Sequence, residues 1–127
     1  MNKKVIITGG CGDIGFAIGK FFQSKEFEVV LTGIDEDEIN SRPEIENITY
    51  ELLDVTSDES VKTLIKKHDN FHVLVNAAGN VMREKEFEIN NFANVVDVHL
   101  NGTYRMCSSS VDILSKSLFK KFPFSIS

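Results

Sequence analysis

Residues 5–19 constrain the fold most, because three apolar residues lead into a glycine-rich turn and then into a helical pattern. Val5, Ile6 and Ile7 are β-branched, as in a buried strand. The apolar residues that follow the turn recur at helical spacing and predict one buried helix face: Ile14, Ala17, Ile18, Phe21 and Phe22. A strand, a tight turn and a helix in this order predict an α/β unit at the start of the chain.

The turn between this strand and helix is suited to binding a phosphate. Glycine tolerates positive φ and lets a ligand approach the backbone closely. The first N–H groups of the helix and its positive end point at whatever lies in front of them. Glycines also serve ordinary strand-to-helix packing, but a turn in this setting matches the dinucleotide-binding fingerprint. We therefore predict a cofactor-binding turn at Gly9, Gly10, Cys11, Gly12, Asp13, Ile14 and Gly15.

Further strands alternate with helices along the chain. Apolar runs predict strands at residues 28–33, 48–53 and 71–75, and Thr56 with Glu59 predicts a capped helix after the third strand. Residues 91–117 predict one long helix with an apolar stripe: Phe92, Val95, Val96, His99, Leu100, Thr103, Met106 and Cys107. We expect a single α/β domain over residues 1–127, a Rossmann-type doubly wound parallel sheet that is incomplete at about four to five strands, with an atypical tail at 118–127.

Several candidate ligand-binding residues follow the predicted strands. Asp35 stands roughly 20 residues past the fingerprint, where a carboxylate can accept hydrogen bonds from the adenosine ribose. The acids at 35–38 also suit the start of a helix. Because this turn has four acids and neither Arg nor Lys, we predict NAD over NADP. The other candidates at the strand ends are Asp54, Val55, Asn76, Ala77, Ala78 and Gly79.

The composition disfavours several other classes of protein. The chain has 14 basic and 19 acidic residues and no basic stripe, so we expect no nucleic-acid partner. No apolar run approaches the ~20 residues that span a bilayer, and the N-terminus does not read as a signal peptide. We therefore expect a cytoplasmic protein without membrane contact. Cys11 and Cys107 have no metal-ligand spacing, and we expect free thiols and no metal site.

With these residues in view, positions 4–117 resemble the N-terminal half of a short-chain dehydrogenase/reductase. Residues 8–15 resemble the cofactor turn of that family, and Asp54 with Val55 resembles its adenine-contacting pair. Asn76, Ala77, Ala78 and Gly79 resemble its Asn-Asn-Ala-Gly signature, which lines the nicotinamide side. Residues 97–104 resemble the helix segment that carries its catalytic asparagine.

Three departures from the family pattern bear on function. Asp13 stands at a family glycine, either near a phosphate or turned away as a helix cap, and we favour the cap. His99 aligns with the catalytic asparagine that kinks the helix and holds a relay water, although a histidine on a buried stripe fits equally. Ser127 falls at the catalytic serine by spacing, in a tail that we do not expect to form a working strand, because Pro123 is awkward there.

The resemblance implies an NAD-binding portion of an oxidoreductase that, in its complete form, moves hydride between the cofactor and an alcohol or carbonyl substrate. The family's proton relay needs a Tyr with a Lys four residues later, and neither Tyr50 nor Tyr104 has one. We expect no turnover from this chain alone. The alternatives are a non-catalytic NAD-binding sensor or interaction module, and a remnant that binds nothing. We expect a homo-oligomer that associates through the 91–117 helix or by exchange of strands, because the sheet edge and apolar helix face would otherwise be exposed.

Overall fold

In a computed structural model of the chain, residues 3–79, 88–116 and 124–126 are described. Five parallel strands form one sheet: β1 (Lys4–Thr8), β2 (Glu28–Gly33), β3 (Ile48–Leu52), β4 (Val73–Asn76) and β5 (Phe124–Ile126). Their spatial order is β3-β2-β1-β4-β5, so the chain first moves outward to β3 and then returns to the other side of β1. This order confirms the predicted Rossmann-type sheet and places the switch point between β1 and β4.

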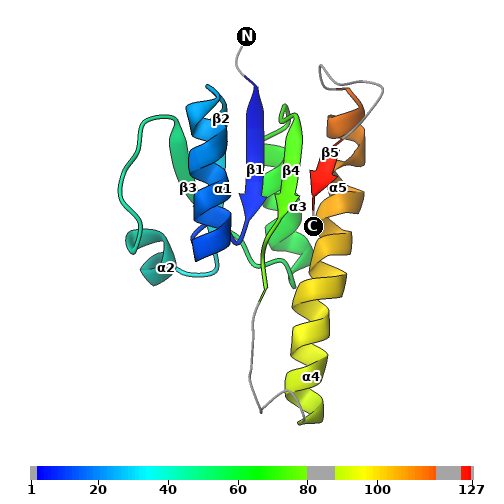
Figure 1. Ribbon diagram of the computed structural model, residues 1–127. Coiled ribbons are helices and arrows are strands. Elements are labelled where there is room, and N and C mark those ends of the chain that lie inside the picture. Colours follow the sequence, from blue (N-terminus) through cyan, green and yellow to red (C-terminus); the bar gives the residue numbers. More distant parts are fainter. Residues whose placement is uncertain (1–2, 80–87, 117–123, 127) are drawn as a thin grey trace.

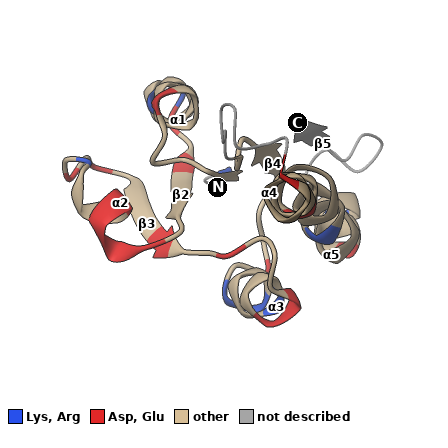
Figure 2. Ribbon diagram, turned by 90° about the horizontal axis from the view of Figure 1, so that it is seen from below, with Lys and Arg blue, Asp and Glu red and all other residues tan. Residues whose placement is uncertain are grey.

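Helices cover both faces of this sheet. They are α1 (Asp13–Ser24), α2 (Glu36–Asn40), α3 (Asp58–Lys67), α4 (Ile89–Val96), the π-helical segment η2 (Asp97–Gly102) and α5 (Thr103–Ser115). α1 lies in front of the sheet in Figure 1, and the view along the strands in Figure 2 shows α3 and α5 on the opposite side. The strands run downward in Figure 1, so all their carboxyl ends lie at the lower edge of the sheet.

Alternation along the strands builds a core on each face of the sheet. Ile6 and Leu74 pack in a cluster with Met106 of α5, whereas Val5 packs in a second cluster with Phe16 of α1. Successive strand residues point to opposite faces, so a continuous apolar run fills both layers. The uninterrupted apolar strands seen in the sequence are therefore explained by cover on two sides.

The buried face of α1 agrees only in part with the predicted stripe, of which Ile18 and Phe22 pack against the core cluster that contains Phe16. Ile14 and Phe21 are 75% and 58% exposed, whereas the buried residues of the helix are Gly15, Phe16 and Gly19. A Cβ atom on Gly19 would lie 2.7 Å from a methyl carbon of Leu31. The helix thus approaches β2 along its glycines, a face that a search for apolar side chains does not detect.

The predicted long helix is present as three joined segments. α4, η2 and α5 together run from Ile89 to Ser115, with π-helical turns in the middle. Met106 of the predicted stripe is buried, but Phe92 and Leu100 are 58% and 65% exposed. Figure 1 shows why: α4 projects past the lower edge of the sheet, where there is no sheet for its apolar side chains to pack against. Among the described residues, no helix is long and apolar enough to span a bilayer.

The tail also departs from expectation. Residues 124–126 form β5, which pairs with β4 so that Phe124 lies opposite Val73 and Ile126 opposite Val75. The prediction of a non-working strand here was wrong. Pro123 precedes the first strand residue in the sequence and lies outside the described residues. Ser127 lies outside the described residues.

Candidate functional site

The glycine-rich turn joins β1 to α1 at the switch point. Gly9 has φ +64°, and a Cβ atom on it would lie 2.5 Å from the Ala77 carbonyl oxygen. The Gly12 N–H donates to Gly9 O at 3.1 Å and closes the turn. A Cβ atom on Gly15 would overlap that same Gly9 oxygen, so the helix starts directly on the turn. Both glycines therefore have a packing reason as well as a possible binding one.

The start of α1 fits a phosphate. The Phe16 N–H donates to Gly12 O at 2.8 Å, so the amides at positions 13–15 precede the helical bonding pattern, as the first amides of a helix do. Gly12 is exposed, and a Cβ atom on it would meet only Gly9 O, at 3.4 Å. Gly12 is thus accessible beside the first amides at the positive end of the helix.

Asp13 does not cap α1, contrary to our prediction. Gly12 is the N-cap residue and makes no side-chain cap, while the Asp13 carboxylate pairs with Arg42 Nη2 at 2.9 Å. Arg42 Nε also donates to Cys11 O at 2.8 Å. Burial, followed by the nearby Glu38 carboxylate, raises the pKa of the Cys11 thiol. Arg42 brings a cation beside the turn, although the acidic run before it holds none.

A cleft of about 420 Å³ opens at the switch point beside the turn. Five of the predicted site residues line it: Gly9, Asp54, Val55, Ala78 and Gly79. Eight lining residues were not predicted: Thr32, Gly33, Ile34, Glu38, Leu53, Thr56, Asn94 and Val98. Among them, Gly33 ends β2. A wider hollow of about 770 Å³ lies along β3 between α2 and α3, but no member of the glycine turn lines it.

Asp35 lies beside this cleft as the cap of a helix. Its Oδ1 accepts from the Glu38 N–H at 2.8 Å, and Glu38 Oε2 accepts from the Ile34 N–H at 3.0 Å. Of the two residues, only Glu38 lines the cleft. The α2 ribbon is mostly coloured as Asp and Glu in the view onto the strand ends (Figure 2), because Glu36, Asp37 and Glu38 form its first turn. The structure thus gives Asp35 the helix-starting role that the sequence left open.

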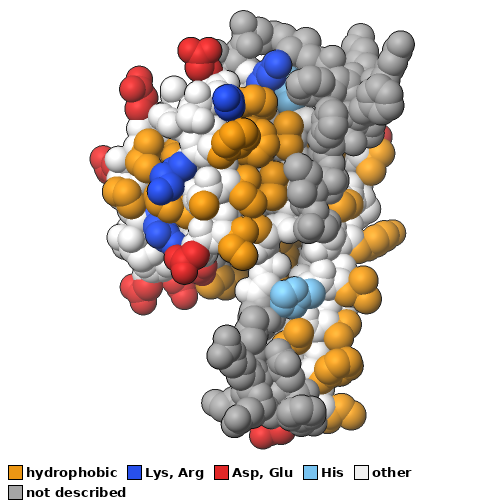
Figure 3. Space-filling view, viewed as in Figure 1, with side chains coloured by type: hydrophobic (Ala, Val, Ile, Leu, Met, Phe, Trp, Pro, Cys, Tyr) orange, Lys and Arg blue, Asp and Glu red, His pale blue; other side chains and the backbone are white. Residues whose placement is uncertain are grey.

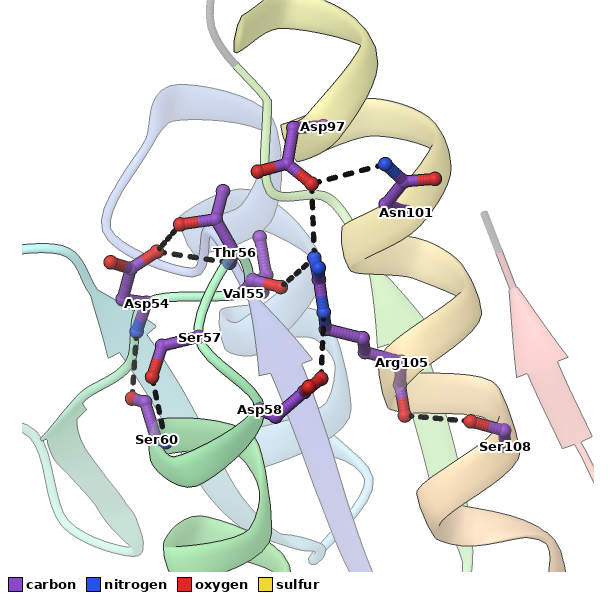
Figure 4. Close-up of polar contacts among 10 residues, drawn as sticks. All are labelled: Asp54, Val55, Thr56, Ser57, Asp58, Ser60, Asp97, Asn101, Arg105 and Ser108. Carbon is purple, nitrogen blue, oxygen red and sulfur yellow. Dashed lines mark hydrogen bonds and ion pairs between the residues drawn. The ribbon is translucent and has the colours of Figure 1, made fainter.

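Asp54 orders the turn that leaves β3. Its Oδ1 accepts from the Thr56 N–H at 2.9 Å and from the Thr56 hydroxyl at 2.6 Å, as drawn in Figure 4. The predicted cap at Thr56 was wrong by one residue: Ser57 Oγ accepts from the Ser60 N–H at 3.1 Å and α3 begins at Asp58. The Thr56 hydroxyl is occupied by Asp54, which explains the shift.

Arg105 of α5 fixes the neighbouring backbone from the other side (Figure 4). It donates to Val55 O at 3.2 Å and pairs with Asp58 at 2.8 Å and Asp97 at 3.1 Å. The pKa of Asp97 is lowered by hydrogen bonds from Asn101 and then from Arg105. No local spacing in the sequence indicates this contact, since 50 residues separate Arg105 from Val55.

The turn after β4 is bonded to β1. The Ala77 N–H donates to Thr8 O at 3.1 Å, and the Ala78 N–H donates to Thr8 Oγ1 at 3.2 Å. Asn76 Nδ2 donates to Cys107 Sγ of α5 at 3.6 Å, so this side chain links the end of β4 to α5. The asparagine and the two alanines therefore hold β4 against its neighbours.

His99 lies in the π-helical segment, against Gly79. A Cβ atom on Gly79 would overlap the imidazole ring, yet His99 is exposed and does not lie on a buried stripe. His99 thus belongs to the π-helical segment η2, and single π-helical turns are frequent at functional sites. His99 lies beside the cleft residue Gly79, whereas Ser127 cannot be placed relative to it.

Comparisons with known proteins agree with this architecture. A 3-oxoacyl-[acyl-carrier-protein] reductase of Chlamydia muridarum is 29% identical over 132 residues, which cover 92% of this chain and 52% of the reductase. An uncharacterized oxidoreductase of Thermotoga maritima is 32% identical over 118 residues, 84% of this chain and 46% of the relative. The chain thus spans about half the length of these curated relatives.

Solved structures show the same fold. ElxO with NADP bound superposes with a TM-score of 0.79 at 28% identity, over 91% of this chain and 52% of ElxO. Thermoplasma acidophilum aldohexose dehydrogenase in ligand-free form gives a TM-score of 0.75 at 25% identity, over 91% of this chain and 46% of that one. The sequence model of the short chain dehydrogenase family matches residues 3–118. By this match and by its fold, the chain belongs to the short chain dehydrogenase family.

Proposed function

We propose that these residues form the dinucleotide-binding part of an oxidoreductase that transfers hydride between a nicotinamide cofactor and an alcohol or carbonyl compound. One observation carries the proposal: Gly9 of the glycine turn lines a cleft of about 420 Å³ at the switch point, together with residues that follow β3 and β4. Gly12 and the amides at 13–15 would hold the phosphates, and Asp54, Val55 and Ala78 would line the adenosine end. The bound cofactor would supply the hydride chemistry.

Two variants at Gly12 test this assignment. Asp and Asn are both good N-cap residues, so Gly12→Asp and Gly12→Asn should each preserve α1. Only the Asp variant places a second carboxylate in front of the phosphates. We expect calorimetry to show saturable dinucleotide binding by the wild type, weaker binding by G12N and the weakest by G12D. A folded wild-type chain that binds neither NAD nor NADP would refute the proposal.

We also propose that the site prefers NAD over NADP. Glu38 lines the cleft and Asp35 lies beside it, and these carboxylates would repel an additional phosphate on the ribose. Arg42 is the nearby cation, but it is already paired with Asp13. ElxO is a relative solved with NADP, so both cofactors are titrated side by side. Glu38→Gln should raise NADP affinity relative to NAD, and tighter binding of NADP than NAD by the wild type would refute the preference.

We propose that these 127 residues bind the cofactor without turning substrate over. Neither tyrosine has a lysine four residues later, so no cation is supplied by the family motif to lower a tyrosine pKa from its usual value near 10. This supports the second candidate, a non-catalytic NAD-binding module. Reduction of NAD above the rate without protein, with a panel of simple alcohols, would exclude that candidate.

Self-association through the α4–η2–α5 column is the final part of the proposal. Its exposed large side chains are Ile89, Phe92, Leu100, Tyr104 and Val111. Apolar side chains follow this column along the right edge of Figure 3. Light scattering should report more than one copy, and Leu100→Glu should lower the mass whereas the exposed control Lys116→Glu should not. A wild-type monomer would refute this part.

A further inference from the structure

Asp13 occupies the position at which a carboxylate would most disturb the proposed phosphate site. It is the first residue of α1, and its side chain is fully exposed. An uncompensated carboxylate about 4 Å from a phosphate is repelled appreciably even in water. The same sequence therefore combines a turn shaped for an anion with an anion of its own.

Arg42 resolves this conflict by geometry. Its Nη2 pairs with Asp13 Oδ1 at 2.9 Å, and its Nε donates to Cys11 O at 2.8 Å. The guanidinium carbon lies 4.4 Å from the centre of the Phe16 ring. The Cys11 carbonyl belongs to the glycine turn and the Phe16 ring belongs to α1. Arg42 is therefore held by the same turn and helix that carry the Asp13 carboxylate.

The burial of the two side chains indicates which one holds the other. The Arg42 side chain is only 23% exposed, whereas that of Asp13 is fully exposed. Two of the three Arg42 contacts do not involve Asp13, so the guanidinium keeps its place independently of the carboxylate. Asp13 is therefore the more exposed partner, and the ion pair with Arg42 directs its carboxylate.

We propose that Arg42 is a positioning residue that neutralises the Asp13 carboxylate and holds it away from the phosphates of the bound dinucleotide. The inference rests on the proposed function. It differs from direct recognition of a phosphate by Arg42, in which the arginine would contact the cofactor itself. The two roles differ in a double variant, because only the positioning role becomes unnecessary when Asp13 loses its charge.

The experiment compares Arg42→Gln, the double variant D13N/R42Q and the control Lys62→Gln. Gln is uncharged and can still donate a hydrogen bond, and Lys62 is an exposed residue of α3 whose loss changes the net charge equally. Calorimetric titrations with NAD and NADP are accompanied by circular dichroism to confirm folding. We expect R42Q to weaken both cofactors about fivefold, D13N/R42Q to return to within about twofold of the wild type, and K62Q to bind as the wild type.

Different outcomes would overturn different statements. If the wild type binds and R42Q binds equally well, or if the double variant stays as weak as R42Q, the positioning role is wrong. If R42Q loses NADP affinity alone, Arg42 recognises the additional phosphate, and the inference is again wrong. If the wild type binds no dinucleotide, the proposed function fails and this inference fails with it.

Discussion

Gly9→Ala tests the most constrained position of the turn. An alanine at φ +64° adopts a left-handed conformation that costs about 1–2 kcal/mol. Its Cβ would also lie 2.5 Å from Ala77 O and 2.6 Å from the Ala78 Cα. Overpacking of this kind costs about 1–3 kcal/mol when the neighbours must move. We expect the free energy of unfolding to fall by about 2–5 kcal/mol, a large part of the usual ~5–15 kcal/mol.

Displacing the neighbours of Gly9 costs free energy, because they are backbone atoms of residues that are hydrogen-bonded to β1. Ala77 and Ala78 both donate to Thr8, at 3.1 and 3.2 Å, and Thr8 lies opposite Asn76 in the ladder between β1 and β4. Relief of the overlap therefore requires these central strands to separate at their carboxyl ends. That movement would also open the cleft beside the turn.

Gly12→Ala is the matched control. Gly12 has φ −73° and ψ 168°, a conformation open to alanine, and its added Cβ would meet only Gly9 O at 3.4 Å. Loss of glycine at an N-cap should change the unfolding free energy by less than about 1 kcal/mol. Urea unfolding followed by circular dichroism measures both variants. A Gly9→Ala chain within about 1 kcal/mol of Gly12→Ala would refute the reasoning from the turn geometry.

Two further predictions concern the pH dependence of stability, and the two effects occur in different pH ranges. Burial raises the pKa of Glu51, but hydrogen bonds from Lys67 and His68 outweigh this effect and leave the pKa lowered. Glu51→Gln should therefore reduce the free energy of unfolding by about 1–2 kcal/mol at pH 7. In urea titrations, the difference in stability between wild type and variant should shrink as the pH falls below ~4.3 and through the folded pKa. Burial lowers the pKa of His72, whose Nδ1 accepts from the Lys4 N–H at 3.0 Å, so the wild type should lose stability as pH falls from ~6.5 through that lowered value. His72→Asn keeps an acceptor in place of Nδ1 and should lose this slope between pH 7 and 5; an unchanged slope would contradict the assignment.

The parts of the fold that could be predicted from sequence depend on local patterns. Apolar runs mark β1 and β4, and glycines between a run and a helical pattern mark the β1–α1 turn. The alternation of strands and helices then predicts parallel strands, whose carboxyl ends lie together at one edge of the sheet. The candidate residues at Gly9, Asp54, Val55 and Ala78 were located in this way, and the structure places all four in one cleft.

The buried face of α1 could be predicted only in part: Ile18 and Phe22 pack against the core as expected, but Gly15 and Gly19, which are buried, have no side chain that an apolar pattern could detect. Hydrophobic periodicity weighs side chains, and it selected Ile14 and Phe21, which are exposed. Gly15 and Gly19 have no side chain to weigh, yet their small size lets the helix approach the turn and Leu31. The helix therefore packs through these glycines together with Phe16, whereas Ile14 and Phe21 remain exposed.

The two arginines that organise the site were missed for a different reason. Arg42 bonds to Cys11 across 31 residues, and Arg105 bonds to Val55 across 50. Neither sequence separation matches the period of a helix or a strand. Each arginine contacts its partner segment only because the fold of the sheet brings the two parts of the chain together. Each joins one strand-end connection to a different element: Arg42 links the segment after α2 to the β1–α1 turn, and Arg105 links α5 to the segment after β3. Local patterns therefore predict which connections reach the cleft. The contacts of Arg42 and Arg105 that fix two of those connections can be identified only in the folded chain.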